Sequence, residues 1–245
     1  RPRTSRGATV TPIEPPLLVA RAEDLAWSDS AQVVVVGWGA AGACAALQAR
    51  QEGASVLVID RFEGGGASAL SGGVVYAGGG TPQQKEAGFV DSPQFMHAYL
   101  RHEVGQVVSD ATLERFCHDS VANQRWLESH GVRFGATMPD HKTSYPPEGK
   151  FLYYSGNEMV PAYGQHLPPG QKPAPRGHRV VAKGQSGATF FAALQKATLQ
   201  VGAQTLLQAS VRRLVCEQNA DGSPGRVLGV EVWHMPAGDA RTAQH

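Results

Sequence analysis

Glycines at fixed spacing follow a run of four valines in the segment Val33-Val34-Val35-Val36-Gly37-Trp38-Gly39-Ala40-Ala41-Gly42. Consecutive β-branched residues are typical of a buried strand, and the small and apolar residues of Ala40–Glu52 predict a helix. At such a strand–turn–helix junction, Gly37 permits a tight turn, Gly39 lets the backbone approach a pyrophosphate, and Gly42 lets helix and strand pack closely. Because the first N–H groups of a helix are unpaired and attract anions, the segment predicts a dinucleotide-binding site.

A second buried strand is predicted at Val56–Ile59, and Asp60 closes it. A carboxylate at this position can accept hydrogen bonds from ribose hydroxyls, and it would repel a 2′-phosphate, which disfavours NADP. The other nucleotide contacts that we expect from this unit are Trp38, Ala40, Ala41 and Arg61. A glycine-rich turn that holds no ligand is the alternative interpretation.

A second run of small residues spans Gly64–Gly73 and reads GGGASALSGG. Such a run lets the backbone lie along a flat ring, and Ser68 and Ser71 supply hydroxyls for ribityl or phosphate oxygens. An NAD-binding unit has no need of this segment, so it favours FAD. The expected contacts here are Ala67, Ser68, Ser71, Gly72 and Gly73. A flexible glycine loop is the alternative.

The elements that position these segments predict an α/β fold with a Rossmann-like parallel sheet, because a β-α-β unit implies parallel strands. Further helices are predicted at 93–104, 109–130 and 187–201, and strands at 205–207, 211–217 and 227–233. We expect the last three strands to form a small β-meander near 204–234. We expect residues 62–88 to be irregular, and 139–179, which hold eight prolines, to form a long structured loop or lid.

The predicted organisation is an extended N-terminal arm at 1–30, one FAD-binding domain at 31–235 that includes the loop 139–179, and a flexible or truncated end at 236–245. The net charge of +1 gives no basic field for nucleic acid. No apolar run approaches the ~20 residues of a membrane span. The nine histidines lack metal-site spacing. Three scattered cysteines, Cys44, Cys117 and Cys216, favour a reducing compartment, and we expect a cytoplasmic protein.

The glycine segments resemble a known superfamily. VVVVGWGAAGACAALQARQEGASVLVID followed by GGGASALSGG resembles the flavoproteins of the fumarate reductase/succinate dehydrogenase superfamily. Within it, GGVVYAGGGTPQQKEAGFVDSP, LYYSGNE and PRGH are most similar to bacterial 3-ketosteroid dehydrogenases of the Δ1 and Δ4-(5α) types. The resemblance covers about residues 31–235 and corresponds to the N-terminal half of such enzymes.

This resemblance implies a dehydrogenase in which a base removes the proton alpha to a steroid ketone while the beta hydride passes to flavin N5. It assigns the pyrophosphate to Gly37, Gly39 and Gly42 and the adenosine ribose to Asp60. It places the ribityl chain and isoalloxazine along Ser68, Ser71, Gly72 and Gly73, and the adenine at the backbone of Val211. Superfamily members with covalent FAD use a histidine in the serine-rich segment. Because no histidine lies between Asp60 and Asp91, we expect noncovalent FAD.

The members of this superfamily are much longer than this chain, so we expect a second polypeptide or C-terminal half to complete the active site around a steroid-like substrate. Most of their catalytic tyrosines lie in that remainder. Tyr145 is the nearest counterpart of one Δ1-type catalytic tyrosine, and a packing role on its proline loop is the alternative. The same two interpretations apply to Tyr153 and Tyr154.

Two other functions remain open. A fumarate-reductase-like site for small dicarboxylates would need clusters of arginine and histidine, whereas 139–179 is rich in tyrosine and proline. A non-catalytic FAD-binding module or subunit is the second. Arg176-Gly177-His178 could line a substrate channel or brace the loop, and His118-Asp119-Ser120 is interpreted as a solvated helix face rather than a catalytic triad.

Overall fold

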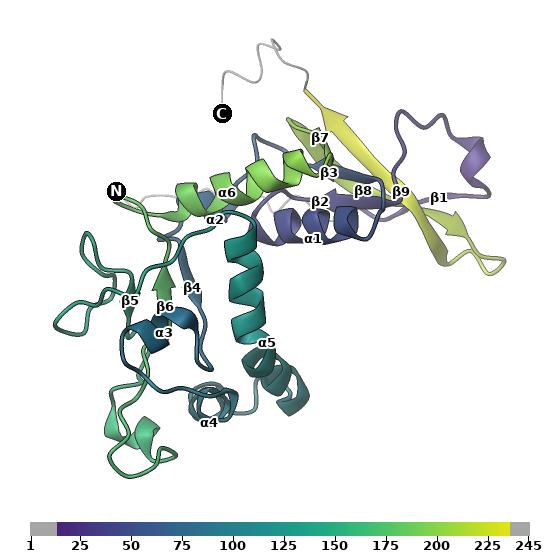
Figure 1. Ribbon diagram of the computed structural model, residues 1–245. Helices are drawn as coiled ribbons and strands as arrows, with labels where there is room; N and C mark the ends of the chain where they lie inside the picture. The colour runs from purple at the N-terminus through teal and green to yellow at the C-terminus, as the bar shows by residue number, and fades with distance from the viewer. Residues whose placement is uncertain (1–13, 236–245) are drawn as a thin grey trace, which may run out of the picture. The chain divides into compact units, whose positions relative to one another are not determined.

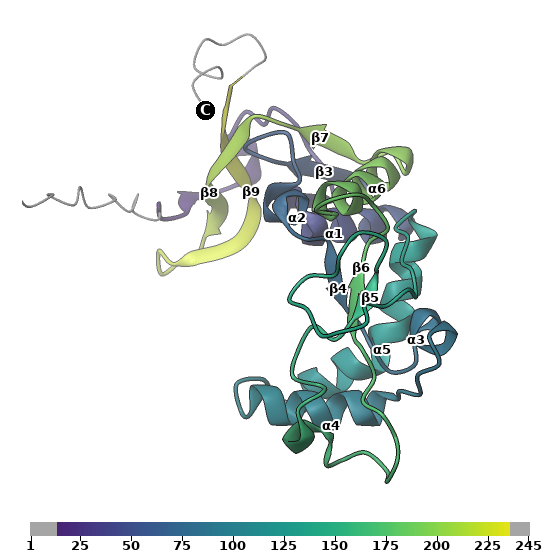
Figure 2. The same cartoon turned by 90° about the vertical axis from the view of Figure 1, so that its left-hand side faces the viewer.

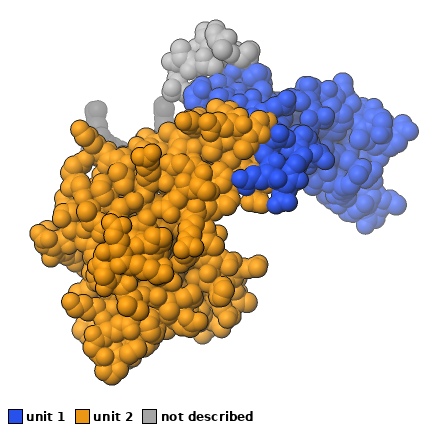
Figure 3. All heavy atoms as spheres, in the orientation of Figure 1, with its two compact units in different colours: residues 1–38, 49–64, 203–245 blue, residues 39–48, 65–202 orange. Residues whose placement is uncertain are grey.

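A computed structural model describes residues 14–235 of the chain, and its helices and strands are labelled in Figure 1 and seen from a second side in Figure 2. The described residues form two compact units, coloured separately in Figure 3. Unit 1 comprises 14–38, 49–64 and 203–235, and unit 2 comprises 39–48 and 65–202. The predicted flexible end at 236–245 and the first part of the predicted arm, 1–13, lie outside the described residues.

Unit 1 contains the predicted parallel sheet. Its strands β2 (Val33–Val36), β3 (Val56–Ile59) and β7 (Gln204–Leu206) lie in the order β2-β3-β7, and both pairs are parallel. This arrangement confirms the α/β fold with a parallel sheet. All four residues of β3 are buried, but Val34 and Val36 of β2 are exposed. The valine run therefore predicted the strand correctly and overestimated its burial, because β2 is an edge strand of the described sheet.

A second sheet of unit 1 joins β1 (Leu17–Val19), β8 (Ala209–Gln218) and β9 (Pro224–His234) in the order β1-β8-β9. Strands β8 and β9 form a long antiparallel hairpin (Figure 2). Strand β1 runs parallel to β8. The predicted meander over 204–234 is thus a hairpin, since β7 belongs to the parallel sheet. Strand β1 and the short helix η1 (Ala22–Asp24) lie in the stretch that was predicted as an extended arm.

The apolar core of unit 1 lies between its two sheets. Buried Leu57 and Ile59 of β3 pack with buried Ala209 of β8. The partly buried side chains that pack on this cluster are Ala31, Leu206, Val211, Val230 and Val232. The cluster therefore holds the carboxyl end of β3, where Asp60 follows, against the β8–β9 hairpin.

Three helices of unit 2 agree closely with the sequence prediction: α4 (Pro93–Val104), α5 (Asp110–Ser129) and α6 (Gly187–Gln200). Helix α1 (Ala40–Gln51), also as predicted, contributes residues to both units. Serine caps define two of the starts, because Ser92 Oγ accepts the Phe95 N–H and Ser109 Oγ accepts the Thr112 N–H. Met96, Leu113 and Cys117 form the buried contact between α4 and α5.

Short elements occupy stretches that were predicted to be irregular. Residues 62–88 contain α2 (Gly66–Leu70), β4 (Val74–Tyr76) and α3 (Pro82–Glu86). The predicted loop 139–179 contains β5 (Leu152–Tyr153), the short helix η2 (Pro161–Gly164) and β6 (Gly177–Arg179). Strands β4, β6 and β5 form an antiparallel sheet in that order. Within the described residues, no helix combines the length and the apolar character needed to cross a membrane.

A buried ion pair stabilises unit 2. Arg176 Nη2 lies 2.8 Å from Asp91 Oδ1 and Arg176 Nε lies 3.0 Å from Asp91 Oδ2, and the two side chains are 3% and 1% exposed. Asp91 Oδ2 also accepts the Gly79 N–H and the Gln84 amide. The pair therefore connects the residue that precedes β6 to the loop before α4.

Replacing Arg176 by methionine should destabilise the fold by about 3–5 kcal/mol, because it leaves the Asp91 carboxylate buried without its cation. Urea unfolding followed by circular dichroism measures the loss. The matched control is Arg115→Met, which breaks an exposed pair with Asp119 and should change stability by less than about 1 kcal/mol. If the two variants lose the same free energy of unfolding, the buried pair contributes no more to stability than the exposed pair.

Candidate functional site

In unit 1, the end of β2 and the end of β3 are joined by backbone hydrogen bonds. Gly37 has a φ of 93°, which favours glycine, and its N–H donates to the Ile59 carbonyl over 2.7 Å. The Trp38 N–H donates to Asp60 Oδ2 over 2.7 Å and the Phe62 N–H donates to Asp60 Oδ1 over 2.8 Å. The carboxylate predicted to bind ribose is therefore fixed at the Gly37 turn, and each oxygen keeps a lone pair for a hydroxyl.

Two further predicted contacts lie in unit 1. Arg61 is exposed, and its guanidinium lies 4.8 Å from the centre of the Phe62 ring, which restrains the side chain beside Asp60. Val211 pairs with Val232 in the hairpin, directly before a β-bulge at Arg212. Its side chain packs on the Leu57–Ile59 core, so its backbone is held in place.

In unit 2, α1 begins against Ser68. The Ala40 N–H donates to Ser68 Oγ over 3.0 Å, so this hydroxyl caps the helix and keeps its own hydrogen for an acceptor such as a phosphate oxygen. A Cβ atom at Gly39 would lie 3.5 Å from Ser68 Oγ and 3.8 Å from the Gly65 carbonyl oxygen, which are ordinary contacts. Because the protein's own packing leaves room for a side chain at Gly39, the glycine fits the close approach of a ligand.

The Gly64–Gly73 segment is ordered by its own hydrogen bonds. Ser71 Oγ donates to the Ser68 carbonyl over 2.8 Å and accepts the Gly73 N–H over 3.1 Å. Ala67 and Ser71 are exposed. The structure therefore favours an ordered segment over the alternative of a flexible glycine loop, and the exposed residues of this segment could lie along a cofactor.

Tyr145 contacts the same segment. Its hydroxyl donates to the Gly72 carbonyl over 2.8 Å and lies 3.3 Å from the Gly184 carbonyl. The ring lies so close that a Cβ atom at Gly72 would be 2.7 Å from its Cε2 atom. A hydroxyl that donates to a carbonyl is already engaged, so this geometry suits a packing and positioning role. A catalytic role for Tyr145 stays a prediction.

The other two tyrosines of this loop are held by protein contacts. Tyr153 is buried in β5, and burial raises the pKa of its phenol. The Tyr154 hydroxyl donates to the Pro173 carbonyl over 3.0 Å, and burial raises its pKa to about 12. Neither phenol is poised to act as a base near neutral pH.

The structure favours bracing over channel lining for Arg176-Gly177-His178. His178 is fully buried, its Nε2 lies 2.9 Å from Thr81 Oγ1, and its Nδ1 lies 3.0 Å from the Arg176 carbonyl. Burial lowers the pKa of His178 to about 4, so the ring is neutral at physiological pH. In α5, the solvated-face interpretation holds for exposed His118 and half-exposed Asp119, whereas Ser120 is buried and accepts the Gly78 N–H.

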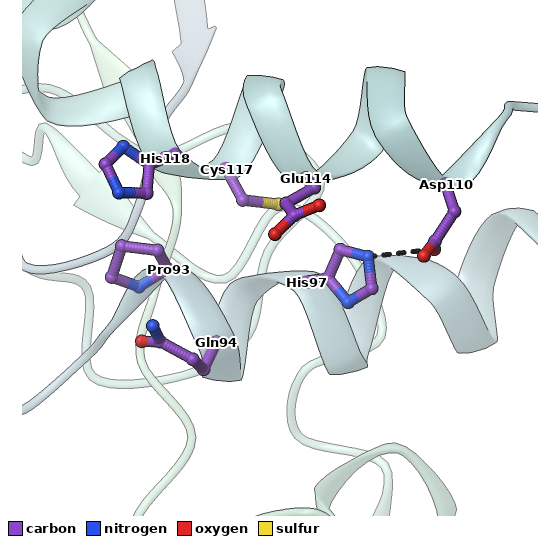
Figure 4. A pocket seen from close by; sticks show the side chains of 7 residues that line it. All are labelled: Pro93, Gln94, His97, Asp110, Glu114, Cys117 and His118. Atoms are coloured by element: carbon purple, nitrogen blue, oxygen red, sulfur yellow. Dashed lines mark hydrogen bonds and ion pairs between the residues drawn. The ribbon is translucent and has the colours of Figure 1, made fainter.

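A cavity of about 240 Å³ lies between α4 and α5, and Figure 4 shows the side chains that line it. His97 and Asp110 are hydrogen-bonded in its wall, with 3.1 Å between His97 Nε2 and Asp110 Oδ1. The other lining residues are Pro93, Gln94, Glu114, Cys117 and His118. None of the predicted cofactor contacts lines it, and the described residues contain no metal-binding group of three or more His, Cys, Asp or Glu side chains.

Comparison with known proteins identifies the family. A family model described as an FAD binding domain matches residues 32–244. The chain belongs to the FAD binding domain family. This result confirms both the resemblance to FAD flavoproteins and the prediction of FAD as the cofactor, and it disfavours a glycine-rich turn without a ligand.

Two relatives of this FAD-binding chain are steroid dehydrogenases. It is 59% identical over 242 residues to the 3-oxo-5-alpha-steroid 4-dehydrogenase of Comamonas testosteroni, covering 97% of this chain and 44% of the relative. The solved structure of the 3-ketosteroid-delta4-(5alpha)-dehydrogenase of Rhodococcus jostii RHA1, in complex with 4-androstene-3,17-dione, superimposes with a TM-score of 0.81. That match is 32% identical and covers 89% of this chain and 44% of the other.

A third relative is described as a probable fumarate reductase. The chain is 30% identical over 192 residues to a probable fumarate reductase of Shewanella frigidimarina, covering 77% of this chain and 27% of the relative. The chain thus spans less than half the length of each of these three relatives.

Replacing Gly39 by valine should abolish FAD binding while leaving the fold intact, because the added side chain fills the space that the pyrophosphate would approach. The flavin absorbance of the purified protein measures occupancy, and far-ultraviolet circular dichroism measures folding. The control is Gly164→Val, since a Cβ atom there has no neighbour within 4 Å. Stoichiometric FAD in the Gly39 variant would overturn this assignment.

Proposed function

We propose that this chain is the FAD-binding part of an oxidoreductase that dehydrogenates a 3-ketosteroid. The observation that carries the proposal is the 59% identity to a 3-oxo-5-alpha-steroid 4-dehydrogenase over 97% of the chain. FAD, when bound, supplies a hydride acceptor at flavin N5. The protein's part is to bind and orient this cofactor and the substrate, and to stabilise the charge that develops on the ketone oxygen.

The roles we propose for the residues follow their geometry. Asp60, fixed by two backbone N–H groups, binds the adenosine ribose. Gly39 and the start of α1 receive the pyrophosphate, with the Ser68 hydroxyl as a donor. The backbone of Ser71–Gly73, exposed at Ser71 and partly exposed at Gly72, lies along the ribityl chain and the isoalloxazine. The further contacts of this proposed site are Gly37, Trp38, Ala40, Ala41, Gly42, Arg61, Ala67 and Val211.

The catalytic centre also needs protein beyond these residues. Each steroid relative is more than twice as long as the part that this chain covers. We propose that the corresponding polypeptide, as another part of the same protein or as a separate subunit, forms the steroid pocket and supplies catalytic groups. The cytoplasmic location also stays a prediction. The three cysteines on which it was based lie within the described residues and are free thiols.

A dicarboxylate substrate is the second candidate, because the chain is also similar to a probable fumarate reductase. A dicarboxylate site needs accessible cations. The two arginines of the 139–179 segment are Arg176 and Arg179, and both are buried and engaged with protein acceptors. This part of the structure therefore favours the ketosteroid over the dicarboxylate.

Under anaerobic conditions, a 3-ketosteroid should bleach the flavin absorbance of the purified FAD-containing protein. Fumarate should fail to reoxidise the protein after chemical reduction. Stopped-flow absorbance measures both reactions. The opposite pattern would assign the protein to the dicarboxylate branch, and a protein that binds FAD but reacts with neither would be a non-catalytic module.

FAD should be released by acid precipitation, because no histidine lies between Asp60 and Asp91 to form a covalent bond of the kind known in the superfamily. After precipitation and centrifugation, flavin fluorescence should appear in the supernatant, leaving a colourless pellet. Flavin that stays with the protein, detected as added mass on a peptide, would contradict the noncovalent assignment.

A further inference from the structure

Arg179 is a buried cation in unit 2 beside the proposed flavin segment. Its side chain is 1% exposed, and it extends from β6, where Arg179 is paired with Val74 of β4. The Val180 N–H donates to the Gly73 carbonyl over 2.9 Å. The backbone of Arg179 is therefore fixed directly next to the Gly72–Gly73 segment.

The guanidinium of Arg179 is satisfied almost entirely by neutral acceptors. Nε donates to Ser186 Oγ over 3.1 Å, and Nη2 donates to the Gly184 carbonyl over 2.5 Å. The remaining acceptors are the carbonyls of Pro146, Pro147, Lys150 and Ala182. Its ion-pair partner is Glu148, whose Oε2 lies 3.8 Å from Nη2 and whose side chain is 61% exposed, so water screens this carboxylate. The positive charge of Arg179 is thus hydrogen-bonded but weakly neutralised.

Two side chains connect this guanidinium to the flavin segment. It lies 4.9 Å from the centre of the Tyr145 ring, and that ring contacts Gly72 while its hydroxyl donates to the Gly72 carbonyl. On the other side, Ser186 is the neighbour of Gly73, since a Cβ atom at Gly73 would lie 2.5 Å from the Ser186 carbonyl carbon. Arg179 therefore holds both residues that support the Gly72–Gly73 backbone.

We propose that Arg179 is a positioning residue of the flavin site. It fixes the Gly72–Gly73 backbone through Tyr145 and Ser186, and its buried positive charge favours the reduced cofactor. The inference rests on the proposed function, because it takes Gly72–Gly73 as the backbone along the isoalloxazine. A hydride carries two electrons and one proton, so it has a net charge of −1. Its transfer moves one negative charge from the substrate to the cofactor. A cation within about 12 Å changes such an equilibrium about tenfold at an effective dielectric constant of about 20.

The test compares charge variants by the ratio of reduced to oxidised flavin, measured against a reference dye during anaerobic photoreduction of the complete FAD-containing protein. Arg179→Met should lower this ratio about tenfold, equivalent to about 30 mV for a two-electron couple. Glu148→Gln should change it in the opposite direction by a smaller factor, because it removes the screened carboxylate beside Arg179. The matched control is Glu114→Gln, an exposed carboxylate on α5 that should leave the ratio unchanged.

Tyr145→Phe separates positioning from charge. It keeps the ring and the cation but removes the hydrogen bond to the Gly72 carbonyl, so it should weaken FAD binding several-fold and leave the ratio unchanged. If Tyr145→Phe alters the ratio as much as Arg179→Met does, the position of the backbone and not the charge sets the ratio of reduced to oxidised flavin. This result would overturn the proposed effect of the Arg179 charge.

If Arg179→Met does not fold, Glu148→Gln alone decides, since its exposed side chain makes it tolerant of substitution. An unchanged ratio in folded Arg179→Met would overturn the inference, and where that variant does not fold, an unchanged ratio in Glu148→Gln would overturn it. These outcomes differ from failure of the proposed function, in which the unsubstituted protein holds no FAD or its flavin is not bleached by a 3-ketosteroid.

Discussion

The close backbone contact between the end of α2 and the start of α6 sets the geometry of unit 2 around the proposed flavin segment. The Gly187 N–H donates to the Ser71 carbonyl over 3.0 Å, and a Cβ atom at Gly187 would lie 2.4 Å from that oxygen. At Gly73 a Cβ atom would collide with the Ser186 backbone. The two segments can meet only because both positions are glycine. Strand β4 begins from this contact and pairs with β6, which carries Arg179.

Glycines of the two cofactor segments are needed for three different physical reasons. Gly37 is needed for its left-handed φ, and Gly73 for the approach of another backbone. Gly39 has neither constraint, because a Cβ atom there would make ordinary contacts. The last kind of glycine is informative about function, since its small size serves something other than the fold. The motif predicts different roles for Gly37 and Gly39 from the sequence, whereas the close approach of the Ser186 backbone to Gly73 is visible only in the coordinates.

Sequence patterns predicted the elements that are long enough to show a period or a cap. Helices α4 and α5 begin after serine caps that can be read directly, and the valine run marks β2. The patterns missed β4, β5 and β6, which have two or three residues each and lie in stretches rich in glycine or proline that favoured irregular structure. Helix α3 was missed although Thr81 and Gln84 form a capping box with proline at the first turn, a signal that was available. The sheet to which β7 belongs depends on tertiary pairing, which no local pattern encodes.

A backbone motif lets the sequence propose cofactor contacts, whereas the role of a side chain that burial decides cannot be proposed from the sequence. Arg176 and Arg179 lie three positions apart, and the pattern PRGH marks Arg176 as a candidate but gives no sign of a role for Arg179. The structure pairs Arg176 with the buried Asp91 carboxylate, and at a distance the negative charge of Asp91 cancels the electrostatic field of Arg176. Arg179 contacts carbonyl dipoles and one exposed carboxylate instead, so less of its positive electrostatic field is cancelled than at Arg176. A buried charge held by neutral dipoles influences its surroundings in a way that a buried ion pair does not. The fold therefore uses one arginine to join its parts and leaves the other as a fixed positive charge beside Gly72 and Gly73.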